Sequence, residues 1–80
     1  MFVTVQYFKE QFNAYAGKEY TFKTDLDLVE FQKVLVPTNK KGEFKKALVR
    51  RINVKWEDID PDYRDNLKTI TQIDKGENLW

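Results

Sequence analysis

The stretch FVTVQYF at residues 2–8 decides the fold class, because β-branched and aromatic side chains alternate along it with polar ones. Val3, Val5 and Tyr7 fall on one face of an extended chain, and polar residues lie between them. This period of two, in residues that favour extended backbone, is typical of a β-strand with one buried face. The sequence therefore predicts a first strand at residues 2–8.

The segment that follows predicts two more strands. Residues 19–24 alternate again after a turn signal at Gly17, so we expect them to form a hairpin with the first strand. Asp25 is expected to cap a short helical turn that tucks the next apolar side chains under the sheet. Residues 31–37 predict a third strand that ends at Pro37, because proline lacks the N–H that a central strand needs.

The second half of the chain predicts the last two strands. Residues 44–54 form the longest candidate, and the break in its alternation at residues 50–51 indicates a bulge or a strong bend. Asp60 before Pro61 is typical of a helix N-cap with proline at the first helical position, so one or two helical turns are expected there. Residues 67–73 predict the final strand.

Five strands with short polar connections imply a small, mostly β, five-stranded antiparallel barrel with one short helical turn. A chain of 80 residues makes one domain, which we place at residues 1–74. Residues 75–80, which include Trp80, are expected to form a flexible C-terminal tail.

The composition excludes several kinds of chemistry. The chain has no cysteine and no histidine, which removes disulfides, the usual zinc sites, thiol nucleophiles and imidazole acid–base catalysis. We therefore expect no catalytic residues, no metal, no cofactor and no small-molecule substrate. No apolar run approaches the roughly 20 residues of a membrane span, and the N-terminus resembles a strand more than a signal peptide. These features favour a reducing cytosol without membrane contact.

The net charge of +1 hides an uneven distribution. Residues 1–32 sum to −2, residues 33–56 sum to +7 and residues 57–80 sum to −4. A strongly basic segment in a nearly neutral domain is a candidate contact surface.

The basic segment supplies the first candidate binding site, for a protein or a nucleic acid. Its cationic members are Lys40, Lys41, Lys45, Lys46, Arg50, Arg51 and Lys55, and the aromatic residues Phe44 and Trp56 bracket it. On one face of a barrel these residues would neutralise phosphates and stack bases, or contact an acidic protein surface. Alternation, however, sends neighbouring lysines to opposite faces. The plainest interpretation is a solvated edge strand, which lysine protects from aberrant pairing.

An acidic surface forms the second candidate, with Glu57, Asp58, Asp60, Asp62 and Asp65 within nine residues. Its opening spacing resembles that of a calcium loop, but the loop's sixth position lacks glycine and Thr69 stands where a bidentate glutamate belongs. We expect no calcium there. A surface that mimics DNA or binds a basic host protein remains open beside a role in capping and solubility. Asp25 and Asp27 are interpreted as a capped turn and not as an acid–base pair, because 80 residues promise no pocket to shift their pKa values.

Several landmarks, taken in order, resemble a loose family of small proteins encoded by tailed bacteriophages and prophages. The landmarks are Tyr20-Thr21-Phe22-Lys23-Thr24-Asp25-Leu26-Asp27-Leu28, Val34-Leu35-Val36-Pro37-Thr38, Lys46-Ala47-Leu48-Val49-Arg50, Ile59-Asp60-Pro61-Asp62 and Ile70-Thr71-Gln72-Ile73-Asp74. The resemblance covers residues 2–74. The family pattern has a Gly-Asp turn before the third strand, whereas this chain has Val29-Glu30-Phe31-Gln32, with Phe31 in place of the glycine.

The resemblance implies an SH3-like barrel and a phage or prophage origin, and it transfers no catalytic residues. We therefore expect a non-catalytic accessory or inhibitory protein in the host bacterial cytoplasm. Its leading partner is a host protein, for example a nuclease or a polymerase. The alternative is a nucleic-acid-binding module of phage replication or transcription that uses residues 40–55. A structural or virion component is the third possibility.

Overall fold

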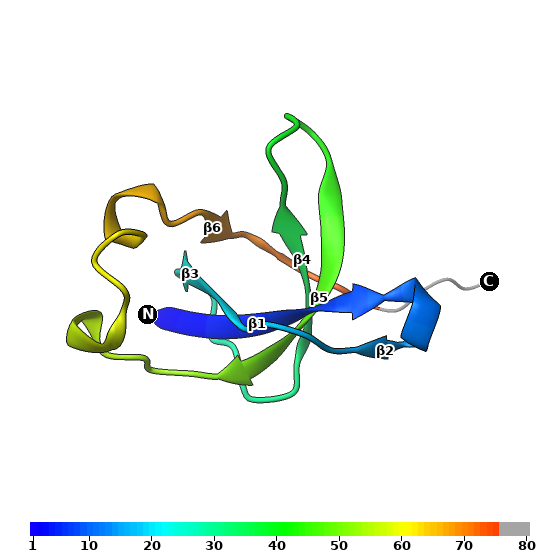
Figure 1. Ribbon diagram of the computed structural model, residues 1–80, viewed down its shortest axis with the longest axis horizontal. Helices are drawn as coiled ribbons and strands as arrows, with labels where there is room; N and C mark the ends of the chain where they lie inside the picture. Colours follow the sequence, from blue (N-terminus) through cyan, green and yellow to red (C-terminus); the bar gives the residue numbers. More distant parts are fainter. Residues whose placement is uncertain (76–80) are drawn as a thin grey trace.

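β-strands and short 3-10 turns make up the computed structural model, which describes residues 1–75 (Figure 1). The strands are β1 (Phe2–Lys9), β2 (Ala14–Tyr15), β3 (Tyr20–Thr24), β4 (Lys33–Pro37), β5 (Phe44–Arg51), β6 (Thr69–Ile70) and β7 (Gln72–Ile73). The 3-10 turns are η1 (Glu10–Phe12), η2 (Trp56–Asp58) and η3 (Arg64–Asn66). The predicted class, a small barrel that is mostly β, is confirmed. Of the tail predicted at residues 75–80, residues 76–80 lie outside the described residues.

Alternating apolar residues build the core, as the sequence predicts. One face of each long strand points inward, so that valines from β1, β4 and β5 are fully buried. Leu28, from the connection before β4, and Ile70, from β6, are buried in the same core. The core residues are Val3, Val5, Phe22, Leu28, Val34, Val36, Ala47, Val49 and Ile70.

The sheet curls into a nearly closed barrel because one extended segment pairs with both of its edges. The strand order is β6-β3-β1-β5-β4-β7, and β6 and β7 are separated only by Thr71. β6 pairs with β3 in parallel, and β7 pairs with β4 in antiparallel. The predicted last strand is therefore present but split, and the ladder between β3 and β6 is the parallel exception in a sheet that is otherwise antiparallel across residues 1–75.

The bulge predicted in the fourth long strand is confirmed. Thr4 of β1 faces Arg51, and the next residue, Val5, faces Val49, so Arg50 is the extra residue on β5. β5 ends at Arg51 and not at residue 54, because Asn53 turns the chain with a φ of 54°. A bulge increases local twist and bends the strand, which helps the sheet to curl.

Two turn predictions are wrong. Residues 25–28 contain no helix, and the side chain that organises them is Thr24 and not Asp25. The Thr24 hydroxyl accepts a hydrogen bond from the Leu26 N–H at 3.0 Å and donates one to the Ile70 carbonyl at 2.8 Å. A buried threonine thus ties the turn to the closing segment, which an exposed aspartate beside it does not do.

The helix predicted at Asp60 is also shifted. The Asp60 carboxylate accepts a hydrogen bond from the Asp62 N–H at 3.0 Å, and the Asp60 carbonyl accepts one from the Tyr63 N–H at 2.9 Å. These bonds make a turn that leads into η3, which begins at Arg64. Aspartate favours such local turns because its short side chain reaches the backbone two residues on.

The third strand begins at Lys33, two residues later than predicted. Phe31 precedes it with a φ of 69°, a left-handed conformation. Its N–H donates a hydrogen bond to the Val49 carbonyl at 2.7 Å. Phe31 therefore adopts a conformation that glycine adopts more readily.

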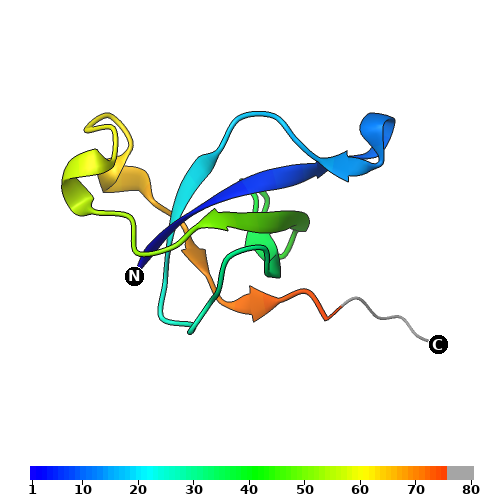
Figure 2. The same ribbon diagram turned by 90° about the horizontal axis from the view of Figure 1, so that it is seen from below.

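Two hairpins extend beyond the barrel wall. The β4–β5 hairpin and the β1–β2 hairpin point in different directions from the shared core (Figures 1 and 2). β2, which pairs with the end of β1 through Phe8 and Lys9, was not predicted. In residues 1–75 no helix has the length and apolar character needed to cross a bilayer.

Candidate functional site

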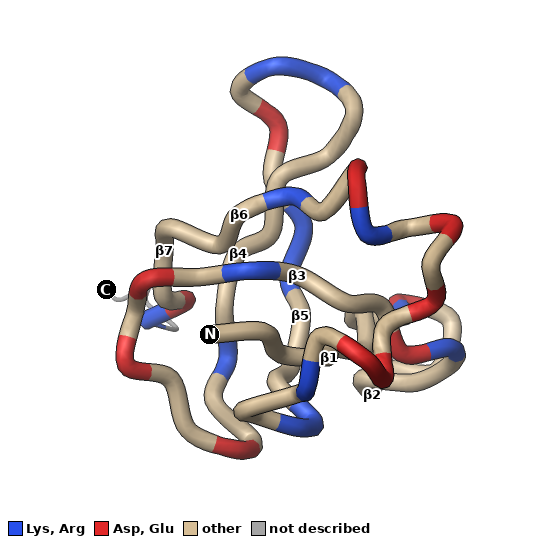
Figure 3. The backbone as a smooth tube through the Cα atoms, turned by 90° about the vertical axis from the view of Figure 1, so that its left-hand side faces the viewer, with Lys and Arg blue, Asp and Glu red and all other residues tan. Residues whose placement is uncertain are grey.

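The basic segment does not form one continuous surface. Lys40 and Lys41 lie at the tip of the β4–β5 hairpin, and the other cations follow β5 and the chain after it. Figure 3 shows Lys and Arg positions both at that tip and along β5 instead of on a single face. Lys45 and Lys46 occupy successive positions of the strand, so their side chains leave on opposite faces.

The two arginines of β5 are engaged within the molecule. The Arg51 Nε lies 3.2 Å from the Glu19 Oε1, which is the one ion pair among residues 1–75. The Arg50 guanidinium lies 5.3 Å from the centroid of the Phe31 ring. Since both cations already have partners, they are less available to a ligand than the sequence suggests.

The two bracketing aromatic residues also lie apart. Phe44 starts β5 beside the hairpin tip and is partly exposed. Trp56, which follows the exposed Lys55, packs against Phe2 with ring centroids 5.5 Å apart and carries the Arg64 guanidinium at 5.2 Å. Trp56 therefore covers one end of the barrel and does not extend the basic strand.

The acidic surface is exposed along the connection from η2 to η3. All five members, Glu57, Asp58, Asp60, Asp62 and Asp65, are exposed. Arg64 spans this connection: its Nε donates to the Ile59 carbonyl at 3.0 Å and its Nη2 donates to the Glu57 carbonyl at 3.2 Å. In the described part of the chain no three acidic side chains converge as a metal cluster would require.

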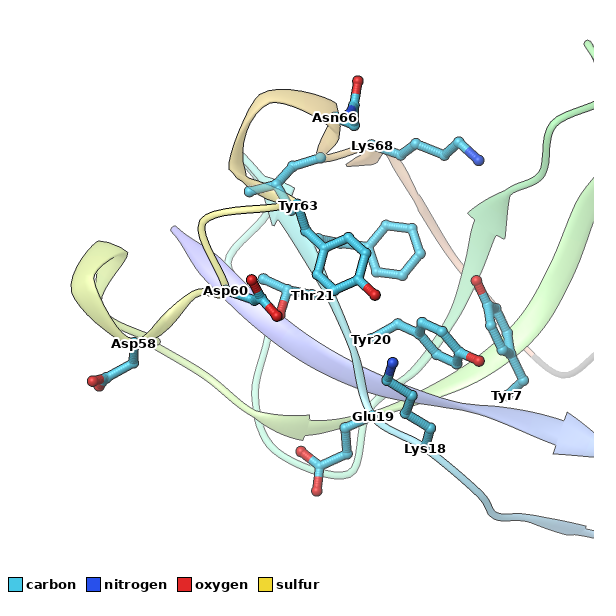
Figure 4. Close-up of a pocket in the computed structure, with 12 residues that line it drawn as sticks. Tyr7, Lys18, Glu19, Tyr20, Thr21, Asp58, Asp60, Tyr63, Asn66 and Lys68 are labelled. Atoms are coloured by element: carbon cyan, nitrogen blue, oxygen red, sulfur yellow. The ribbon is translucent and has the colours of Figure 1, made fainter.

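A groove lined by tyrosines lies between β1, β3 and the connection to η3. Tyr7 from β1, Tyr20 from β3 and Tyr63 from the connection to η3 lie along it, with Lys18 and Lys68 at its sides (Figure 4). Its volume is about 480 Å³. We call this site the tyrosine groove. It lies where the inward faces of β1 and β3 continue past the barrel wall.

Ring contacts organise the tyrosine groove. The centroids of Tyr7 and Tyr20 lie 5.0 Å apart with the ring planes tilted by 43°. Burial raises the pKa of the Tyr7 phenol, and the neighbouring Tyr20 raises it further. Tyr20 and Tyr63 remain 41% and 53% exposed, so a ligand can reach both rings.

Two lysines from distant parts of the chain contact these rings, and a third lines the groove. The Lys18 ammonium lies 5.6 Å from the Tyr20 centroid and 5.5 Å from the Tyr63 centroid. The Lys45 ammonium lies 5.8 Å from the Tyr7 centroid. The Lys68 ammonium donates a hydrogen bond to Asn39 Oδ1 at 2.6 Å, which links the groove to the β4–β5 hairpin.

Glu19 lines the same groove but is held by other groups. The Thr4 hydroxyl donates to Glu19 Oε1 at 2.6 Å, and Arg51 lies against the same oxygen. These interactions, led by the Thr4 hydrogen bond, lower the pKa of the Glu19 carboxyl against the opposing effect of desolvation. Thr4 and Arg51 therefore compensate its charge, and the carboxylate points away from the tyrosine rings (Figure 4).

A second cleft continues from Tyr7 between the two projecting hairpins. Its volume is about 370 Å³, and its basic lining residues are Lys9, Lys45 and Lys46, with Glu10 at one side. Tyr7 lines both sites. Only Lys45 and Lys46 of the predicted basic site therefore lie near the groove.

Sequence reasoning missed most of the tyrosine groove. Lys18 and Tyr20 come from the chain around the start of β3, and Tyr63 and Lys68 from the segment before β6, and no local motif connects the two segments. One pattern carries part of the information: Tyr7 and Tyr20 continue the inward-facing alternation of their strands, but they end in a polar hydroxyl. Inward-facing tyrosines at strand ends indicate the mouth of a barrel, where a ring is half buried and its hydroxyl meets water.

In comparisons with known proteins, no protein-family profile, curated protein or solved structure matches this chain. The interpretation of the site therefore rests on its geometry.

Proposed function

We propose that this chain is a non-catalytic accessory protein that binds an extended segment of a macromolecule in the tyrosine groove. The observation that carries the proposal is the placement of the Lys18 ammonium between the exposed rings of Tyr20 and Tyr63. Tyrosines are favoured at binding surfaces because they combine a large contact area with little loss of side-chain entropy.

The proposal keeps the accessory or inhibitory role expected from the sequence. It places the binding surface at the tyrosine groove instead of the basic segment. The basic strand and its bracketing aromatics are replaced by groove residues, and of the basic strand Lys45 stays close to them through its contact with the Tyr7 ring. The resemblance to phage proteins supports a partner in a host bacterial cytoplasm. Both leading partner classes, a host protein and a nucleic acid, suit an open groove flanked by cations.

A role without catalysis is supported by the environment of the groove. General acid–base work needs a titratable group with a shifted pKa facing the ligand. In the groove the shifted groups are Tyr7, whose pKa moves further above neutrality, and Glu19, whose carboxyl is tied to Thr4 and Arg51. Neither is prepared to exchange a proton near neutral pH.

An affinity experiment from bacterial lysate tests the proposal. The tagged protein is compared with a Lys18→Glu variant in the groove and a Phe12→Ala control in η1, where the side chain is 67% exposed and remote from the groove. Bound proteins and bound nucleic acids are identified with and without nuclease treatment. We expect a partner that Phe12→Ala retains and Lys18→Glu loses. Equal retention by both variants would refute the groove as the binding surface.

A further inference from the structure

The tyrosine groove has the components of a site for single strands. Tyr7, Tyr20 and Tyr63 follow one another along it, and the latter two expose about half of their surface (Figure 4). Flat bases stack on such rings regardless of sequence, because every base has a π-face. The bases of a duplex are already stacked on one another and cannot reach the rings, so the geometry favours an unpaired strand.

The lysines around the groove supply the charge that a polyanion needs. Within residues 1–75, none of Lys18, Lys45 and Lys68 has a carboxylate within ion-pair distance. Their contacts are neutral: tyrosine rings for the first two, and the Asn39 amide oxygen for the third. A phosphate oxygen offers each ammonium a charge-assisted hydrogen bond, which is stronger than a contact with a neutral partner.

The acidic side chains near the groove limit the path that a bound nucleic-acid strand can take. Glu19 is compensated by Thr4 and Arg51, and Asp58 points away from the rings in Figure 4. Asp60 stands at the Tyr63 end. Repulsion from Asp60 therefore favours a strand whose phosphates run on the Tyr20 and Tyr7 side into the second cleft, where lysines outnumber acids, while an uncharged base still stacks on the Tyr63 ring.

We propose that the tyrosine groove binds a short single-stranded nucleic acid, with bases stacked on its tyrosines and phosphates neutralised by Lys18, Lys45 and Lys68. The inference rests on the proposed function, since it names the partner of the same surface. The three tyrosine rings offer stacking for three bases, close to the lower end of the range for small barrels, about four nucleotides. The aromatic rings supply affinity, while the ammonium groups steer the strand and make binding sensitive to salt.

Fluorescence anisotropy with labelled oligo(dT) and oligo(rU) of about eight nucleotides tests the inference. We expect binding at low salt whose logarithmic salt slope is about −2, since three phosphate contacts each contribute about 0.7. Lys68→Gln should reduce the slope by about 0.7, whereas the control Lys23→Gln, on the exposed side of β3 outside the groove, should leave it unchanged. Tyr63→Leu should weaken binding about 5- to 150-fold, and Phe12→Leu should not.

Three outcomes separate this inference from the proposed function. Oligonucleotide binding that is equally reduced by Lys23→Gln and Lys68→Gln would overturn the inference, because charge alone would then explain it. No binding at low salt, together with a host protein that Lys18→Glu fails to retain, would overturn the nucleic acid and leave the groove as a protein site. If Lys18→Glu changes neither assay, both the inference and the proposed function fail.

Discussion

Phe31 provides the sharpest test of how the turn before β4 is built. The residue has a φ of 69°, and its ring, which is 64% exposed, carries the Arg50 guanidinium at 5.3 Å. Replacement by glycine removes the left-handed strain and the ring together. Replacement by alanine removes the ring and keeps the strain. A comparison of Phe31→Gly with Phe31→Ala therefore isolates the backbone contribution to the free energy of unfolding.

The expected difference follows from two opposing effects. A left-handed conformation costs a residue with a Cβ atom about 1–2 kcal/mol. The greater freedom of glycine in the unfolded chain offsets about 0.4–1 kcal/mol of that gain. We expect Phe31→Gly to be about 0.5–1 kcal/mol more stable than Phe31→Ala. Since loss of the cation–π contact costs about 0.5–1 kcal/mol at an exposed site, Phe31→Gly should nearly equal the wild type.

Urea unfolding followed by far-ultraviolet circular dichroism measures all three proteins. The m-values should agree, because none of the changes alters the surface exposed on unfolding by much. A Phe31→Ala variant as stable as Phe31→Gly would refute the assignment of strain at this position. It would mean that the Phe31 N–H bond to the Val49 carbonyl forms without a left-handed backbone.

Two further predictions concern buried and partly exposed hydrogen bonds. Thr24→Val should destabilise the fold by about 1–3 kcal/mol in urea unfolding, because it leaves the Ile70 carbonyl and the Leu26 N–H without their partner. Glu19→Gln should destabilise it at neutral pH and progressively less in acid. The pKa of Glu19 is lowered in the folded protein, so its stabilisation is present above the unfolded value of about 4.3 and is lost as pH falls through the lower folded value.

Matched variants control both measurements. Thr21→Val lies on the same strand as Thr24, at a site that lines the groove, and should change stability by less than about 0.5 kcal/mol. Equal losses for the two threonine variants would contradict a special role for the Thr24 hydroxyl. Glu10→Gln, in the exposed η1 turn, is the matched control for the loss of one surface carboxylate. A constant gap between Glu19→Gln and the wild type from neutral to acidic pH would contradict the lowered pKa.

The barrel was largely predictable because most of its strands carry their own alternation. Val3 and Val5 in β1, and Val34 and Val36 in β4, are buried in the register that the sequence indicates. The bulge at Arg50 was visible as a break in the same pattern. These elements depend on residues two positions apart, which a single sequence displays directly.

The turns were less predictable because two neighbouring polar side chains can each form the hydrogen bond that organises the turn. Asp25 and Thr24 both suit a cap, and burial against the closing segment selects the threonine. Similarly, the pairing of residues 69–73 with two edges depends on the curvature of the whole sheet. Nothing within those five residues indicates a parallel neighbour.

The tyrosine groove was the least predictable feature, because it too depends on contacts between residues far apart in the sequence. Lys18 and Tyr63 lie far apart in the chain and meet only after the barrel closes. The basic segment attracted attention because its charges are adjacent in sequence. In the folded chain, strand alternation places neighbouring lysines on opposite faces, and Arg50 and Arg51 contact Phe31 and Glu19. The charges therefore do not form one surface.

Closure of the barrel by residues 69–73 has a consequence for how the protein is made. The hydrogen bond from Thr24 to Ile70 joins residues 46 positions apart, so the sheet stays open until the later segment has left the ribosome. At about 5–20 residues per second, synthesis of the 46 residues from Thr24 to Ile70 takes roughly 2–10 s, during which β3 lacks its closing partner. Bare edges invite pairing with other chains, and a translational pause just before residue 69 would prolong that exposure.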